Sequence, residues 1–273
     1  MTRTRRVGRG CLQAFAGVVT LLNCVLCGVI GVRLIRFAAR SKGPEAWLGV
    51  YLLAGTLLGT LLSGVVYISW ADPSVTLPPA WRPPLHALQF LANAAGMIGI
   101  LMFTHRVFRP RARWARRVVL LAAALSAVAF VVTAAVERFE IRVIPNPSYL
   151  AVVAARVAAM VWMTVESLLY FGQLRRRQRL GLADPLLVNR FLLWGIWAGS
   201  VALVQLADPI ARFWYWWITG TTVQWLPEVG RTIIVFMIAT TSALGAVTAA
   251  TLFLTFFPTA AYKRWLAAHA ITE

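Results

Sequence analysis

Glu166 is the residue whose type and position point most directly to chemistry. It lies inside the long apolar stretch Tyr149–Gln173, about nine residues before Arg175. An ionised carboxylate in apolar surroundings is costly, so we expect Glu166 to be protonated or matched by a hydrogen-bond donor. Such a group can grip a ligand, carry a proton or act as a switch. The alternative is a protonated carboxyl that bonds a neighbouring helix and holds a bundle together.

Other polar side chains are expected at the same depth as Glu166. Counting the same distance along the other apolar stretches leads to Asn93, Ser200 and Thr248. Three tryptophans are expected to supply apolar walls around them: Trp162, Trp194 and Trp197. The sequence therefore predicts a ligand or switch site at this level of the protein.

Arg156 is a second ionisable residue in the same stretch, ten residues before Glu166. At 1.5 Å per residue of helix it lies about 15 Å away, which is too far for the two side chains to pair. Its long side chain is expected to reach outward to Glu137 or Asp208 in a structural ion pair. The alternative is that Arg156 binds an anionic ligand.

Long apolar stretches must position all of these side chains. Hydrophobic residues make up 60% of the 273-residue chain and charged ones 13%, against roughly 45–50% and 25% in soluble domains. Seven stretches are each close to the roughly 20 residues that a helix needs to cross a bilayer: Cys11–Val32, Ala46–Trp70, Leu85–Thr104, Val118–Val136, Tyr149–Gln173, Phe191–Ala207 and Thr232–Phe257. We therefore predict an all-α protein, a single bundle of seven transmembrane helices with no sizeable soluble domain.

The aromatic segment after the sixth stretch is too short to cross a membrane. It follows Asp208-Pro209 and contains the sequence Phe-Trp-Tyr-Trp-Trp-Ile at 213–218. Trp and Tyr favour the level of the lipid headgroups. We therefore predict an interfacial or re-entrant segment at about 213–225.

The 27 Lys and Arg residues give a net charge of +18, and most of them fall on one side of the seven stretches. They concentrate at 33–42, 106–117, 175–190 and 263–264. Basic loops face the cytoplasm, so we predict a cytoplasmic C-terminus and an external N-terminus. The arginines near the N-terminus oppose this orientation, which leaves open whether the first stretch crosses. We expect the basic links to face anionic lipid headgroups rather than nucleic acid.

Small residues indicate close contacts between helices. The second stretch contains Gly55-x-x-x-Gly59-x-x-x-Ser63, and the sixth contains Gly195-x-x-x-Gly199. Small residues four apart allow helix backbones to approach. An Asp-Pro pair also lies just after each of these two stretches, at 72–73 and 208–209, so stretches 1–3 and 5–7 are candidates for parallel three-helix repeats, a plan found in carriers.

Motifs of soluble enzymes do not occur in the sequence. It has no Gly-rich phosphate loop, no His-Glu-x-x-His and no Gly-x-Ser-x-Gly. His86, His105 and His269 are scattered, and Cys24 and Cys27 have no neighbouring His or carboxylate, so we expect the two thiols to pack inside a helix. The sequence therefore predicts no enzyme, no metal site and no cofactor.

Three groups of residues resemble a known kind of protein. They are His105–Pro110 with Arg113–Arg116, Glu166–Leu168 with Leu180–Pro185 and Asn189–Trp194, and Phe256–Pro258 with Ala261–Trp265. Together they resemble an uncharacterised family of bacterial seven-helix membrane proteins. The tail resembles the membrane region of seven-helix bacterial sensor proteins, which implies a cytoplasmic signalling partner.

We therefore expect a receptor-like or sensor-like protein that binds a small apolar ligand or a lipid within the bundle. The alternative is a small-solute transporter built from two three-helix repeats that the fourth stretch joins.

Overall fold

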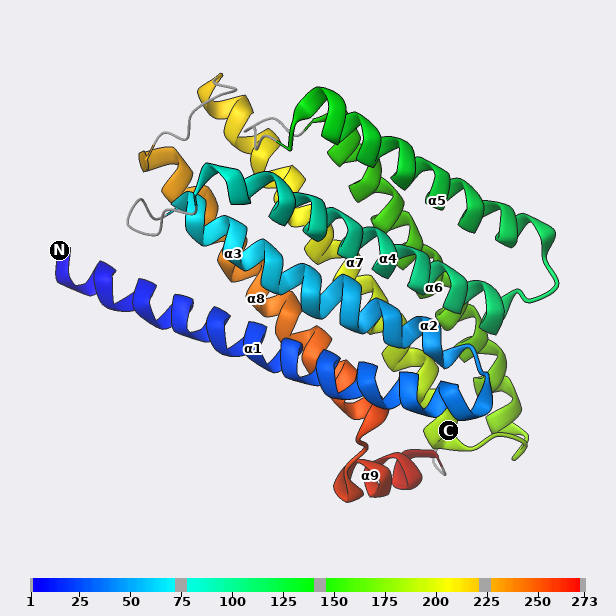
Figure 1. The fold of residues 1–273 in the computed structure, drawn as a ribbon. Coiled ribbons are helices and arrows are strands. Elements are labelled where there is room, and N and C mark those ends of the chain that lie inside the picture. Colours follow the sequence, from blue (N-terminus) through cyan, green and yellow to red (C-terminus); the bar gives the residue numbers. More distant parts are fainter. Residues whose placement is uncertain (1, 72–77, 140–145, 221–226, 271–273) are drawn as a thin grey trace.

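The computed structural model describes the chain except residues 1, 72–77, 140–145, 221–226 and 271–273 (Figure 1). The described residues form helices and short links, and none of them lies in a strand. The elements are α1 (Thr2–Ser41), α2 (Glu45–Val50), the π-helix η1 (Tyr51–Leu58), α3 (Gly59–Ala71), the short 3₁₀-helix η2 (Pro79–Trp81), α4 (Arg82–Phe108), α5 (Arg113–Val132), the π-helix η3 (Thr133–Glu137), α6 (Pro147–Arg179), α7 (Pro185–Thr219), α8 (Pro227–Phe256) and α9 (Ala260–Ala270).

Seven helical segments among the described residues are long and apolar enough to cross a membrane, as the sequence predicts. They are Ala14–Ser41, Glu45–Val65, Arg82–Phe108, Arg113–Glu137, Pro147–Arg179, Pro185–Thr219 and Val235–Phe256. The all-helical fold and the seven candidate spans are therefore confirmed, and the chain is a multi-pass membrane protein. Local signals fit these bounds, since α6 and α7 begin with a proline and Asp184 caps α7 by accepting a hydrogen bond from the Leu186 amide at 2.9 Å.

The sixth span differs from its prediction. The sequence predicts that it ends at Ala207 and that a separate segment occupies 213–225, whereas α7 continues through the buried Pro209 to Thr219. The predicted end at Ala207 is therefore wrong, since residues 213–219 belong to α7, and residues 221–225 lie outside the described residues. The interfacial position of this segment stays a prediction. Neighbouring helices allow proline inside a membrane helix. The helix ends instead at Gly220, whose φ of 64° is the left-handed conformation typical of a helix C-terminus.

The helices form a closed ring with one helix outside it. In order, α1 packs on the second span (α2, η1 and α3), which packs on α4, followed by α6, α7 and α8, and α8 returns to α1. α5 lies outside this ring against α4 and α6, as Figure 1 shows. The outward side chains of α5 are exposed and apolar, Leu121 and Val128 among them, which suits a surface that faces lipid.

Small residues bring the second span against α4, as the sequence predicts. A Cβ atom added at Gly96 would lie 2.4 Å from the Gly55 Cα atom, so the two backbones touch there. A Cβ atom at Gly59 would lie 2.9 Å from the Asn93 Oδ1 atom. One turn further on, the Gln89 amide donates to the Ser63 hydroxyl at 2.6 Å. The whole Gly55–Ser63 stripe therefore faces one helix.

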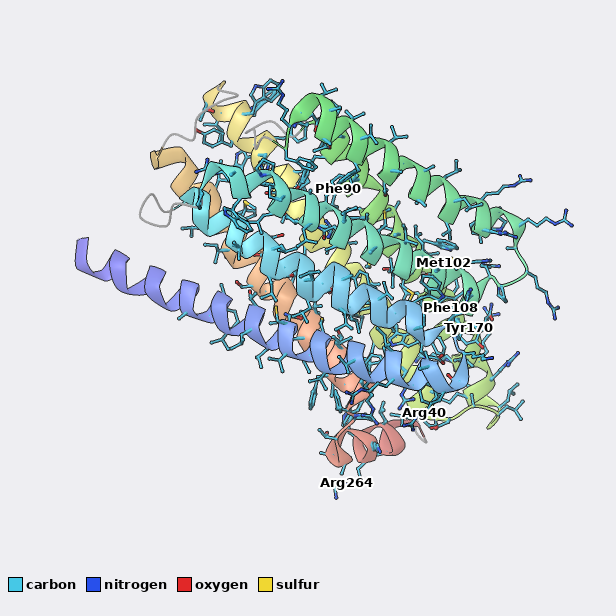
Figure 2. The ribbon with its side chains drawn as sticks, in the orientation of Figure 1. Arg40, Phe90, Met102, Phe108, Tyr170 and Arg264 are labelled. Carbon is cyan, nitrogen blue, oxygen red and sulfur yellow. The ribbon has the colours of Figure 1, made fainter. Side chains whose placement is uncertain are left out.

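The basic links lie together at one end of the ring. Figure 2 shows Arg40, Phe108, Tyr170 and Arg264 toward the end that carries the C-terminus, whereas Phe90 lies nearer the other end. α9 is tied to the first turns of α7 by a hydrogen bond from the Asn189 amide to the Tyr262 hydroxyl. The described part of the chain thus has one strongly basic end.

Candidate functional site

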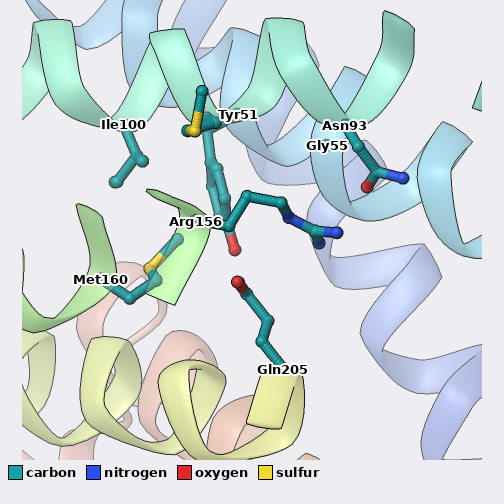
Figure 3. Close-up of a pocket in the computed structure, with 8 residues that line it drawn as sticks. Tyr51, Gly55, Asn93, Ile100, Arg156, Met160 and Gln205 are labelled. Atoms are coloured by element: carbon teal, nitrogen blue, oxygen red, sulfur yellow. The ribbon is translucent and has the colours of Figure 1, made fainter. Parts of the chain in front are cut away.

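A small polar cavity lies inside the ring, between the second span, α4, α6 and α7 (Figure 3). Its volume, as the space open to the centre of a water-sized sphere, is about 10 Å³, which is room for about one water molecule. The lining residues are Tyr51, Gly55, Asn93, Met97, Ile100, Arg156, Met160 and Gln205. Four helices therefore contribute to one site that mixes apolar walls with polar side chains.

Arg156 is the one charged residue among those lining this cavity. Its guanidinium group is always protonated. In Figure 3 its side chain runs into the space between Tyr51, Asn93 and Gln205. Across the described part of the chain, no carboxylate forms an ion pair with it.

The ion pair predicted for Arg156 is not formed, because both candidate acids have other partners. Asp208 accepts hydrogen bonds from Arg212 Nε at 2.8 Å and from the Tyr149 hydroxyl at 2.6 Å. Glu137 accepts a hydrogen bond from the Ser148 hydroxyl. The length of the Arg156 side chain suggested these two acids as its partners, but each acid accepts a hydrogen bond from another residue.

Two irregularities of the helices coincide with the cavity. The second span is π-helical from Tyr51 to Leu58, and Tyr51 and Gly55 belong to this segment. Pro209 has no N–H to donate to the Gln205 carbonyl four residues earlier. The Gln205 Oε1 atom is also buried without a hydrogen-bond partner. π-Helical turns and unpaired polar atoms inside a protein often mark functional sites.

Glu166 lies elsewhere, beside the link between α4 and α5. Its Oε1 atom accepts a hydrogen bond from Arg109 Nε at 2.8 Å and another from Trp162 Nε1 at 3.2 Å. The Glu166 side chain is 9% exposed and that of Arg109 is 46% exposed. The hydrogen bond and the charge of Glu166 raise the pKa of Arg109 above its ordinary value. Glu166 therefore connects the middle of α6 to the basic link.

The depth predicted for Glu166 differs from the structure. Arg109 directly follows α4, so Glu166 is level with the end of α4 and not with its middle. The prediction counted from the end of the apolar stretch at Gln173, but α6 continues to Arg179 and overhangs α4. Asn93 is sixteen residues before Arg109, or about 24 Å along the helix, and lies at the cavity instead.

The remaining predicted residues are not hydrogen-bonded to Glu166 in the described structure. Ser200 is buried on α7, and Thr248 donates to the Leu244 carbonyl of its own helix at 2.9 Å. Trp194 packs on Phe103, with ring centroids 5.4 Å apart. Trp197 is buried with its ring 5.6 Å from that of Tyr51, so it supports a cavity wall.

Trp162 does more than form an apolar wall. It donates to Glu166, and its ring lies 5.3 Å from the ring of Trp114 at the start of α5. Five of the eight predicted residues therefore form two groups. Asn93, Arg156 and Trp197 belong to the cavity or its wall, whereas Glu166 and Trp162 belong to the basic end.

Three polar or adaptable side chains of the cavity were missed by the sequence analysis: Tyr51, Gln205 and Met160. Gln205 carried a usable signal, since it is an amide inside an apolar stretch and is four residues before a proline. Among the described residues, no three His, Cys, Asp or Glu side chains are grouped to hold a metal ion. Cys24 and Cys27 are free and buried in α1.

No protein-family model matches this chain, and no curated protein matches its sequence.

The contact between Glu166 and Arg109 predicts a measurable coupling. We expect Glu166→Leu and Arg109→Gln each to destabilise the protein, and the double-mutant cycle to give a coupling free energy of about 1–2 kcal/mol, because one partner is charged and buried. Unfolding in mixed micelles measures it. Arg111→Gln, in the same exposed link, is the matched control and should couple with nothing. Additive effects of Glu166→Leu and Arg109→Gln would contradict the contact.

Proposed function

We propose that this chain is a receptor-like or sensor-like membrane protein that binds a small ligand inside its seven-helix bundle. The observation that carries the proposal is the cavity inside the ring, where polar side chains from four helices meet apolar walls. Ligand sites in helix bundles are built in this way, between facing helices. Within this proposal the protein lies in a bacterial inner membrane and has a cytoplasmic signalling partner, which the sequence resemblance to seven-helix bacterial proteins supports.

α6 connects the cavity to the basic end of the protein. It carries Arg156 at the cavity and Glu166 at the contact with Arg109. It then ends in the basic turn Arg175–Arg179. A ligand that moves α6 at Arg156 would therefore change the Glu166–Arg109 contact. A sensor needs an element of this kind that has two arrangements.

A labelled protein tests this proposal. A fluorophore attached at Arg177→Cys, with the native cysteines replaced by alanine, should respond saturably to at least one of indole, octanol and octanoate in lipid nanodiscs. The response should be lost in Glu166→Gln, although ligand-induced thermal stabilisation remains. If no probe changes the fluorescence or the melting temperature, the receptor proposal is wrong.

The proposed orientation has a cytoplasmic C-terminus and an external N-terminus, and the positive-inside rule supports it. Reporter fusions after Arg113, after Arg179 and at the C-terminus should all report the cytoplasm. A fusion after Asn146, in the link that precedes α6, should report the exterior. An external C-terminus would reverse the whole assignment.

The basic end is proposed to bind anionic lipid headgroups. Each basic residue near such a surface contributes about 1 kcal/mol. Changing Arg175, Arg176 and Arg177 to Gln should reduce the enrichment of phosphatidylglycerol around the purified protein, as measured by spin-labelled lipid. The matched control changes Arg82, at the opposite end, to Gln. Equal enrichment in both variants would exclude this role.

A transporter is the second candidate, and the order of the ring supports it. One set of three neighbours is α1, the second span and α4, with the second span in the middle. The other set is α6, α7 and α8, with α7 in the middle. The two sets touch where α4 packs on α6 and where α8 packs on α1. Two three-helix repeats related by a rotation would give this order, with α5 as the connector. Uptake of a labelled cavity ligand into proteoliposomes would favour the transporter, and binding without uptake would favour the receptor.

A further inference from the structure

The chemistry of the cavity identifies the kind of ligand it takes. We propose that the cavity binds a small anionic group, of the size of a carboxylate, with Arg156 as its counter-charge. This inference rests on the proposed function, since it names the ligand class of the same cavity.

The charge of Arg156 requires a partner of opposite sign. A guanidinium group inside a membrane protein cannot lose its proton, and an unpaired charge there is strongly disfavoured. Glu166 is bound to Arg109, and Asp208 is bound to Arg212 and Tyr149. Glu137 binds Ser148. Among the described residues no acid therefore forms an ion pair with Arg156, and a bound anion would supply its counter-charge.

The polar side chains around Arg156 are hydrogen-bond donors. Tyr51 offers a hydroxyl, and Asn93 and Gln205 offer amides, so every polar side chain that lines the cavity can donate a hydrogen bond. None of the lining side chains is acidic. The buried Gln205 Oε1 atom has no partner, so rotation of this amide to present its NH₂ group breaks no hydrogen bond of that oxygen. The site would repel a cation and suits an anion.

The size of the cavity and the shape of the guanidinium group suit a small anion. The planar guanidinium fork matches the two oxygens of a carboxylate. The cavity has room for about one water molecule as it stands. Met97 and Met160 line it, and unbranched thioether side chains adapt easily to a new neighbour. The group that binds is therefore small, either a free anion or the head of a larger amphipathic molecule.

Matched pairs of probes test the inference. The purified full-length protein in phosphatidylcholine nanodiscs, in a buffer without small anions, is titrated with acetate and with acetamide, its neutral counterpart of the same shape. Acetate should raise the melting temperature saturably and bind at least about tenfold more tightly than acetamide, because only acetate is charged. Octanoate and octanamide form the second pair. If octanoate binds far more tightly than acetate, the cavity takes the head of an amphipathic ligand. If the two affinities are similar, it takes a free anion.

Variants assign the effect to the cavity. Arg156→Gln should weaken acetate binding at least about tenfold, since it removes the charged donor. Arg82→Gln removes the same charge at the exposed start of α4 and should bind acetate as the parent does. If Arg156→Gln does not fold, Tyr51→Phe and Gln205→Met, which keep the size of the side chains, should each weaken acetate binding.

The outcomes separate this inference from the proposed function. Each charged probe could bind as tightly as its neutral counterpart, with both losing affinity in Asn93→Leu. That result would support a ligand site in the cavity but would show that its ligand need not be an anion. Unchanged acetate binding in Arg156→Gln would also overturn it. No stabilisation by any probe would reject both proposals.

Discussion

Replacing Arg156 with methionine is expected to stabilise the anion-free protein by about 1–4 kcal/mol, because an apolar side chain of similar length replaces a half-buried charge that has no acidic partner among the described residues. Mutations of buried residues usually destabilise, so the sign of this effect is diagnostic. Unfolding in mixed micelles, in a buffer without small anions, measures it.

Acetate should reverse the advantage of Arg156→Met. A ligand at 100 times its dissociation constant stabilises the parent by about 2.7 kcal/mol, whereas a variant without the site gains nothing. Arg82→Met serves as the control and should leave the stability within about 0.5 kcal/mol of the parent, because Arg82 is exposed. A variant Arg156→Met that is less stable than the parent by several kcal/mol would show that Arg156 is already paired within the protein.

Gly96→Ala is expected to be strongly destabilising, by about 1–3 kcal/mol, because it overpacks a contact between two backbones. The added Cβ atom would lie 2.4 Å from the Gly55 Cα atom, and no flexible side chain can move aside there. The two helices must separate, and Gly55 lines the cavity, so ligand binding should weaken as well.

Gly64→Ala and Gly172→Ala are the controls for this contact. Nothing lies within 4 Å of a Cβ atom at either position. Both should be as stable as the parent, since alanine favours helix more than glycine does. If Gly96→Ala melts at the same temperature as these controls, the close contact between the second span and α4 is wrong.

The number and approximate positions of the spans could be predicted from the sequence, because lipid requires long apolar helices. The end of the sixth span could not be predicted from its Asp-Pro pair. Proline breaks helices in water, but Pro209 is buried in α7 and the helix ends only at Gly220. The small-residue stripe of the second span was predictable because close packing leaves a fixed four-residue spacing.

The candidate site was predicted only in part. Asn93, Arg156 and Trp197 were identified by their types, yet they were grouped with Glu166 by a count of depth that assumed helices of equal length. α6 extends past the end of its apolar stretch, which moves Glu166 to the end of α4. Tyr51 faces the cavity from within a π-helical segment, and apolar periodicity carries no signal for a π-helix.

A density map of the protein in lipid nanodiscs, prepared with acetate or octanoate, shows whether an anion occupies the cavity beside Arg156. The account predicts non-protein density next to the Arg156 guanidinium group, bounded by Tyr51, Asn93 and Gln205, that disappears in Arg156→Gln. An Arg156 side chain paired with a carboxylate of the protein, with no added density in the cavity, would contradict it.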